Sequence, residues 1–324
     1  MRLVEAVTAA LVAAPFAIGS AVAGSDQTGV EFRFRDPQIV ESSGLVARDG
    51  LFMTVNDSGD SARTFVVDGS TGRTVGGAAW RGDPVDIEAL APDPDGSVWV
   101  GDIGDNTGSR ESVTLLEVPF EGGYVDAEPR ELTLTYSDGP RDAETLLVHP
   151  VTGRVFVVSK SLLGGVLYAA PERLSASRRN ELEPLGDVLG FATDGAFFPD
   201  GRHFVLRDYG RAVVYSYPEL AAVGELALPD QQQGEGIAVD ENGEVFVSTE
   251  GQFSAVQRVR LPRRIARIVD PPPPSSTPSP APTTSSPSDE SDELEVDRPA
   301  WVWMLGGLVG IGMVVVLVRS LRPR

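Results

Sequence analysis

The stretch DIEALAPDPDGSVWVGDIGDN, residues 86–106, decides the fold because it describes one hairpin whose pattern recurs along the chain. An acidic start leads into an apolar run, then a turn at Pro94, Asp95 and Gly96, then a second strand around 98–100. Two apolar runs on either side of a short Asp/Gly turn are typical of a tight antiparallel pair. Four further copies follow the same pattern, at 42–60, 142–161, 192–210 and 234–251.

The turn glycines show that the copies are evenly spaced. They are Gly50, Gly96, Gly153, Gly201 and Gly243, so one copy follows another every 42 to 57 residues. This interval is close to the length of a four-stranded propeller blade. Third strands are expected at 64–67, 113–118, 166–169, 212–217 and 255–261, and fourth strands are clearest at 131–136 and 225–228. We predict an all-β domain, a β-propeller of five blades, with a poorly repeated sixth blade as the alternative.

The fifth copy has no fourth strand before the chain becomes proline-rich. Residues 30–34, VEFRF, alternate apolar and polar side chains near the other end of the domain. This N-terminal strand is predicted to complete the last blade and close the ring, which removes two exposed sheet edges. Residues 171–181 fit either one surface helix or a long loop.

Both ends of the chain carry targeting patterns. Residues 1–23 have an early Arg2, an apolar core and a small-residue end, which predicts a signal peptide cleaved before Gly24. The propeller then occupies 24–270, a Pro/Ser/Thr-rich and then acidic linker 271–299, a transmembrane helix 300–318 and a basic cytoplasmic stub 319–324. The predicted location is a bacterial plasma membrane, with a single span and the propeller outside. Gly306 and Gly310 allow a helix homodimer, but single-helix anchoring is preferred.

The composition narrows the classes of function. The chain has no cysteine, which excludes disulfides and thiolate chemistry. Lys160 is the one lysine among 27 basic residues, a bias typical of high-GC genomes that favours an actinobacterial envelope. The formal net charge of −20 argues against nucleic acid and anionic lipid as partners, and it favours cations.

Propeller geometry gives the acidic residues a place. The innermost strand of a blade begins on the face where the second strand ends, so both ends of each hairpin lie near the axis on one face. The predicted entrance there is lined by Asp86, Glu88, Asp142, Glu144, Asp194, Glu235, Asn56, Asp57, Asp60, Asp102, Asp105, Asn106, Lys160, Asp208 and Glu250. The turn residues Asp95, Asp200, Asp240, His149 and His203 are expected on the opposite face, which argues against a histidine-based dyad at the entrance.

So many carboxylates at short range raise one another's pKa or require a cation. Calcium is the predicted ion, because it accepts six to eight oxygen ligands in flexible geometry. The predicted metal ligands are Asp86, Asp102, Asp105 and Asn106. The predicted ligand-facing residues are Glu88, Arg110, Glu144, Lys160, Asp194, Asp208 and Glu235. The alternative is that the Asp and Asn residues cap their own loops, which is the preferred interpretation for 56–60.

These motifs resemble a family of exported bacterial β-propellers that implies no settled activity. The resemblance rests on NDSG (56–59), the D-x-E start at Asp86 and Glu88, and GDIGDN (101–106) followed by Arg110, with Glu144 and Lys160 further on. More distantly the chain is similar to NHL, gluconolactonase-like and phytase-like propellers, and GEGIAVDENGEVFV (234–247) looks like an NHL strand pair. Phytase-like propellers use a D-x-E-G-L start for calcium and phosphate, but Ala89 and Thr145 replace that glycine here.

Two classes of function fit these observations. The preferred one is a membrane-tethered binding or sensing module whose calcium-bearing entrance engages a small molecule, a wall polymer or a partner protein. The alternative is a calcium-dependent hydrolase of phosphate esters or lactones, in which the metal and Lys160 stabilise anionic charge. No Ser, Cys or His nucleophile is evident, which favours binding. For Lys160, an ion pair with Glu144 is favoured over an anion-binding role.

Overall fold

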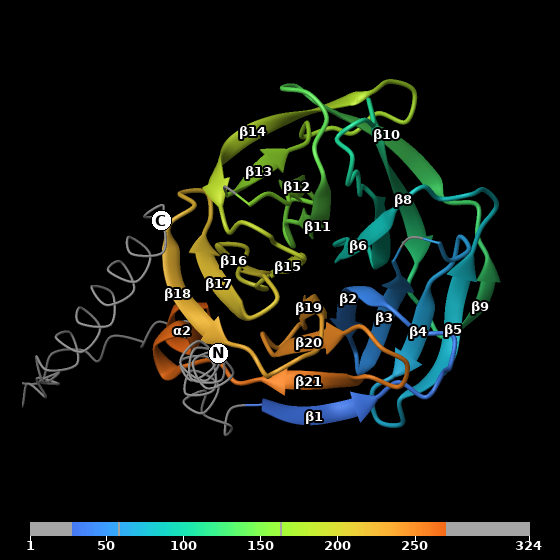
Figure 1. Ribbon diagram of the computed structural model, residues 1–324, viewed down its shortest axis with the longest axis vertical. Helices are drawn as coiled ribbons and strands as arrows, with labels where there is room; N and C mark the ends of the chain where they lie inside the picture. The colour runs from blue at the N-terminus through green and yellow to red at the C-terminus, as the bar shows by residue number, and fades with distance from the viewer. Residues whose placement is uncertain (1–27, 58, 163, 270–324) are drawn as a thin grey trace, which may run out of the picture. The chain divides into compact units, whose positions relative to one another are not determined.

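The computed structural model describes residues 28–57, 59–162 and 164–269, which form β-sheets arranged in a ring (Figure 1). The predicted signal peptide, linker, transmembrane helix and cytoplasmic stub lie outside these residues. Among the described residues, no helix has the length and apolar character needed to cross a membrane.

The ring is β-propeller-like and consists of five four-stranded antiparallel blades in the described part of the chain. Blade 1 contains β2 (Ser42–Arg48), β3 (Leu51–Asn56), β4 (Phe65–Asp68) and β5 (Arg73–Ala79). Blade 2 contains β6 (Ile87–Pro92), β7 (Ser97–Asp102), β8 (Val113–Pro119) and β10 (Arg130–Tyr136). Blade 3 contains β11 (Ala143–Val148), β12 (Val155–Ser159), β13 (Gly165–Ala169) and β14 (Asn180–Val188). Blade 4 contains β15 (Asp194–Phe197), β16 (His203–Arg207), β17 (Arg211–Ser216) and β18 (Ala222–Ala227).

Blade 5 takes strands from both ends of the described chain. It contains β19 (Gly234–Val239), β20 (Val245–Thr249), β21 (Ala255–Val259) and the N-terminal β1 (Thr28–Arg33). β1 pairs antiparallel with β21, with Thr28 opposite Val259 and Arg33 opposite Ala255. The all-β class, the propeller-like ring and the N-terminal strand in its last blade therefore agree with the sequence analysis.

The core lies between blades. Five clusters of buried apolar side chains fill the space between successive blades, and each draws residues from the two blades it separates. Trp99 of blade 2, for example, shares a cluster with Tyr168 of blade 3. Each blade is therefore buried on both faces, which explains the near-continuous apolar runs of the inner strands. The inner strands β2, β6, β11, β15 and β19 contact one another in that cyclic order around the axis.

The outer edge of the ring departs from a simple repeat. A short strand β9 (Gly123–Asp126), from the connection between β8 and β10, pairs parallel with β5 of blade 1. Gly76 makes this possible, because a Cβ there would lie 2.3 Å from the carbonyl oxygen of Gly123. β10 also pairs parallel with β14, so blades 2 and 3 share one sheet. Neither of these pairings was predicted from the sequence.

Two segments outside the blades are a loop before β14 and a short helix after β21. Residues 171–179 form a loop, as one of the two interpretations expected, and β14 begins at Asn180. The unpredicted helix α2 (Arg263–Val269) covers the core between blades 4 and 5 with Ile265 and Val269.

Ring closure can be tested at Phe34, which directly follows β1. Its side chain is buried, packs edge-to-face on Phe32 and belongs to the core between blades 5 and 1. Phe34→Ala should lower the free energy of unfolding by about 3 to 4 kcal/mol, because it leaves a cavity at the closing contact. Chemical denaturation of the full chain measures this. Phe253→Ala is the control, since Phe253 is half-exposed, and an equal loss in both variants would contradict a closing role for β1.

Candidate functional site

The inner strands of blades 2 and 3 begin with the same irregularity. The pairing register shifts between Ile87 and Ala89 in β6, and between Ala143 and Thr145 in β11, as at a β-bulge. Glu88 and Glu144 are the extra residues at these shifts. Bulges re-aim side chains, and both glutamates are buried near the axis, with only 4% and 7% of their surface exposed.

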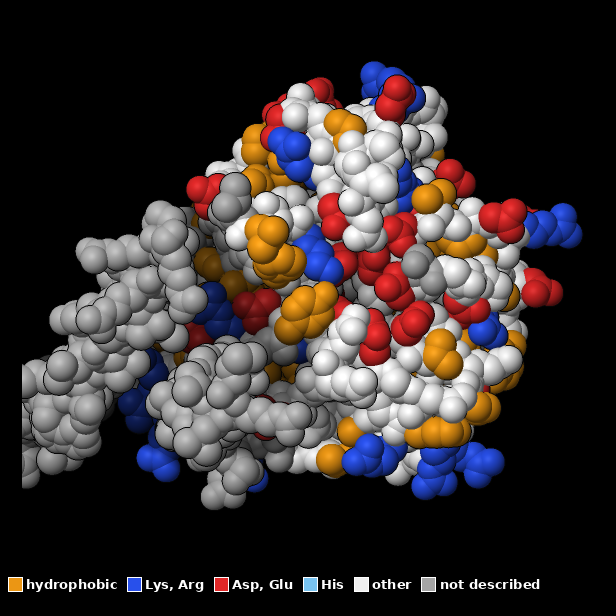
Figure 2. Space-filling view, in the orientation of Figure 1, with side chains coloured by type: hydrophobic (Ala, Val, Ile, Leu, Met, Phe, Trp, Pro, Cys, Tyr) orange, Lys and Arg blue, Asp and Glu red, His pale blue; other side chains and the backbone are white. Residues whose placement is uncertain are grey.

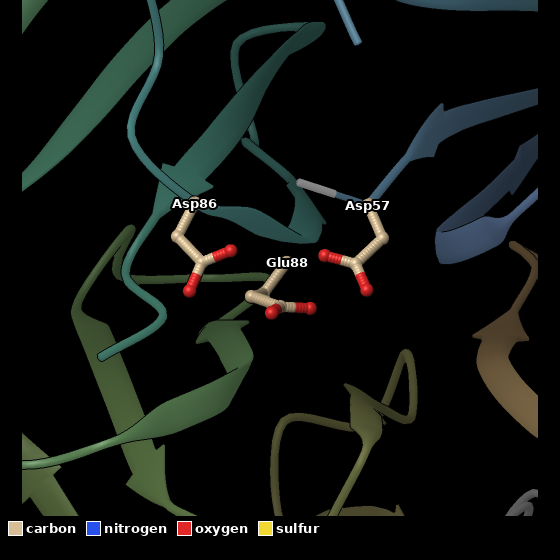
Figure 3. A group of neighbouring side chains, drawn as sticks. All are labelled: Asp57, Asp86 and Glu88. Carbon is tan, nitrogen blue, oxygen red and sulfur yellow. The ribbon is translucent and has the colours of Figure 1, made fainter. Parts of the chain in front are cut away.

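Glu88 belongs to a group of three converging carboxylates. Asp57 follows β3, Asp86 precedes β6 and Glu88 lies in β6, and one oxygen of each lies within 4.8 Å of the others. Figure 3 shows the three side chains pointing toward one another. Gly104, in the loop after β7, provides the space: a Cβ there would lie 2.4 Å from Oδ2 of Asp86 and 2.9 Å from Cγ of Glu88. We call Asp57, Asp86 and Glu88 the carboxylate trio.

The electrostatics of the trio are unfavourable in the absence of a cation. Burial, with the negative charges of Glu144 and Asp57, raises the pKa of Glu88 to about 10. Burial, followed by the charges of Asp57 and Asp142, also raises the pKa of Asp86. Without a metal ion the trio therefore retains a proton at neutral pH, and it has the donor set that a hard divalent cation requires.

A second acidic group lies next to the trio, around Lys160. The Nζ atom of Lys160 forms an ion pair with Oε1 of Glu144 and donates to the hydroxyl oxygen of Tyr209 at 3.1 Å. Burial lowers the pKa of Lys160, but the Glu144 carboxylate outweighs it and the net direction is upward, so this lysine stays charged. Burial raises the pKa of Glu144 to about 7 despite Lys160, and burial together with the charge of Glu235 does the same at Glu250. Figure 2 shows acidic side chains gathered at the centre of this face.

The GDIGDN loop, which contributes three of the predicted metal ligands, is held by its own hydrogen bonds. Asp102 accepts from the N–H of Asp86 at 3.0 Å and forms a 2.8 Å ion pair with Arg110. Asp105 accepts from the N–H groups of Ser109 and Arg110. Asn106 is exposed. Of the four residues predicted as metal ligands, only Asp86 belongs to the trio. Asp105 caps its own loop, as in the alternative interpretation, while Asp102 accepts from the N–H groups of Val85 and Asp86, just before β6.

Two residues predicted to face a ligand are bonded within the protein itself. Asp194 is fully buried, and its Oδ2 accepts from the N–H groups of Ile237 at 2.8 Å and Leu45 at 3.3 Å, so it ties β15 to β19 and β2. Burial raises its pKa well above the usual range. Asp208 caps its own turn and pairs with Arg211 at 3.3 Å. The sequence could not distinguish these roles, because acids at strand ends look alike whether they face solvent or backbone.

Three further positions named in the sequence analysis have these surroundings in the structure. Asn56 caps the loop before β2 by accepting from the N–H of Val40 at 2.9 Å, and His203 pairs with Asp200 at a hairpin turn. Glu235 is buried, and its pKa is raised by burial. Tyr209 was missed, although it follows β16 much as Lys160 follows β12.

Comparisons with known proteins give structural likeness only. No family model matches the chain, and no curated protein matches it. Among solved structures, glutaminyl cyclase from Myxococcus xanthus is similar, with a TM-score of 0.47 and 14% identity, covering 72% of this chain and 95% of that one. A luciferin-regenerating enzyme gives 0.45 and 12%, covering 72% and 95%, and a glucose dehydrogenase gives 0.38 and 12%, covering 68% and 83%. Likeness at this level carries nothing about activity.

The raised pKa values predict how stability depends on pH. A carboxyl whose folded pKa lies above its unfolded value near 4.5 keeps a proton that the unfolded chain releases, so stability falls as pH rises between the two values. With a chelator present, the melting temperature should therefore fall from about pH 5 to about pH 10, mainly through Glu88 above pH 7. Thermal melts of the full chain measure this. Glu88→Gln should flatten the upper part of the curve, and a variant with the wild-type slope would contradict the burial of an uncompensated Glu88.

Proposed function

We propose that the chain is a membrane-tethered, extracytoplasmic binding protein that holds a calcium ion and engages a ligand at its acidic mouth. By the mouth we mean the entrance formed by the carboxylate trio and the acidic group around Lys160. The observation that supports this most directly is the convergence of Asp57, Asp86 and Glu88 within 4.8 Å. Like charges held this close together, one of them on the buried Glu88, oppose folding unless they are neutralised. A chain gains from placing three carboxylates together chiefly when a cation occupies the space between them.

The donor chemistry of the trio fits calcium. Three carboxylates offer up to six oxygen atoms, and neither histidine in the described residues belongs to the group. An all-oxygen set suits Ca²⁺, while a zinc site usually contains His or Cys. A divalent ion would lower the pKa of Glu88 and Asp86 and fix the loops that carry them. The chain's own residues would then hold the mouth in one shape for a ligand.

The tether and the location outside the membrane are proposed from the sequence. Residues 1–23 supply the export signal, 271–299 the spacer and 300–318 the anchor. At about 3.1 Å per residue, an extended spacer of this length holds the propeller up to roughly 80 Å from the bilayer. External protease added to intact spheroplasts should cleave the propeller domain away from the cells.

Calcium binding is tested at Asp86 and Gly104. Asp86→Asn removes an anionic donor, and Gly104→Ala places a methyl group against Asp86 and Glu88, so both should reduce the rise in melting temperature that calcium produces. The control Asp95→Asn changes a turn carboxylate bonded to Ser97 and should leave the calcium response intact. If all three variants respond like the wild type, calcium only screens the bulk negative charge.

The hydrolase alternative depends on Lys160. Its Nζ atom is already engaged by Glu144 and Tyr209, which favours a structural role. Lys160→Met should therefore lower the melting temperature, because Glu144 loses its only ion-pair partner among the described residues. Turnover of p-nitrophenyl phosphate or a simple lactone by the wild type, lost in Lys160→Met at unchanged stability, would instead establish the hydrolase.

A further inference from the structure

A set of exposed apolar side chains borders the acidic mouth on the side of blades 3 and 4. Leu162 is 81% exposed, Tyr209 41% and Phe191 36%. The N–H of Phe191 donates to the carbonyl oxygen of Ser161 at 3.3 Å, and the Tyr209 hydroxyl contacts Lys160, so the three lie on neighbouring loops. Figure 2 shows hydrophobic side chains next to the central acidic ones. We call Leu162, Phe191 and Tyr209 the apolar shelf.

Phe191 occupies the shelf in an unfavourable backbone conformation. Its φ is 54°, in the left-handed region that bulky residues rarely adopt. More than a third of its surface is exposed, so burial of the ring does not offset the whole of this strain. Strain that brings no packing in return is a feature of ligand-contacting segments.

The mouth next to the shelf carries an excess of negative charge. Glu144 is buried, with 7% of its surface exposed. Its Oε1 pairs with Lys160, and its Oε2 has no hydrogen-bond partner in the described part of the chain. Glu235 is also buried, and Glu250 lies close enough for its pKa to respond to the charge of Glu235. The buried guanidinium of Arg207 also acts on Glu235, so two cations, Lys160 and Arg207, face three carboxylates beside the shelf.

We propose that this part of the mouth binds a small organic cation, an ammonium group carried on an apolar or aromatic body. The positive charge would lie against Glu144 and Glu235, and the body would lie on the shelf. Lys160 already lies over the ring of Tyr209, with Nζ 5.5 Å from the ring centroid, so the body of the ligand and not its charge would contact Tyr209. The residues used are separate from Asp57, Asp86 and Glu88. The organic-cation site is therefore distinct from the proposed calcium site.

The test is calorimetric titration of the full chain at about pH 7.5, in saturating calcium, with 2-phenylethylamine, which is charged at that pH. Two probes serve as matched controls: 2-phenylethanol keeps the body without the charge, and methylammonium keeps the charge without the body. Only 2-phenylethylamine should bind measurably. Equal binding of 2-phenylethanol, or no binding of the amine, would overturn the proposal.

The shelf is tested by Phe191→Gly, which removes the ring at a position where glycine suits the backbone. Amine binding should weaken by about fivefold or more without loss of stability, as expected for an aromatic contact to a cation-bearing ligand. The matched control is Phe253→Gly, another exposed phenylalanine, with φ of 61°, that borders a different surface beside Glu31. Equal affinities in the two variants would refute the shelf.

Calcium separates this inference from the proposed function. Phe191→Gly should keep the full calcium-induced rise in melting temperature, because the trio is untouched. A normal calcium response without amine binding would refute the organic-cation site alone. Amine binding that saturating calcium abolishes would also refute it, because the amine would then occupy the carboxylates of the trio.

Discussion

Closure of the ring places equivalent positions of all five inner strands around one axis. The residues at or next to the start of these strands are Ser43, Glu88, Glu144, Asp194 and Glu235. Four of the five are acids, so the geometry that buries the cores between blades also concentrates negative charge at the axis. The chemistry of the mouth follows from this constraint, because the contacts between inner strands fix the backbone positions from which these acids project.

The protein meets this constraint differently in successive blades. Glu144 pairs with Lys160, while Asp194 in the unbulged strand β15 turns to the backbone N–H groups of β2 and β19. Glu88 has neither solution: its carboxylate is within 3.3 Å of the Ser43 hydroxyl and otherwise faces other acids. The compensation is therefore least complete in the trio, and that is why a cation is expected there and not at Asp194.

Periodicity made most of the fold predictable, since hairpins with Asp/Gly turns and alternating strands are local signals. The closing strand was predictable for a different reason, because blade 5 lacked a partner and VEFRF supplied one. The pairing of β9 with β5 was not, since it depends on Gly76 and Gly123 meeting across two blades. The D-x-E spacing indicated Asp86 and Glu88, but the addition of Asp57 required the ring to be closed in three dimensions.

The GDIGDN loop shows how a correct motif can carry an indirect role. The carboxylates of Asp102 and Asp105 accept hydrogen bonds from backbone N–H groups, and Asp102 also pairs with Arg110. These bonds hold the loop beside β6. The small residue that this rigid loop presents, Gly104, is what lets Asp86 and Glu88 approach each other. The motif therefore forms a wall beside Asp86 and Glu88, and its Asp102 and Asp105 carboxylates accept hydrogen bonds from backbone N–H groups. The hydrogen bonds and the ion pair with Arg110 hold this loop against β6, which favours the proposed cation site because the carboxylates then need little rearrangement to bind an ion.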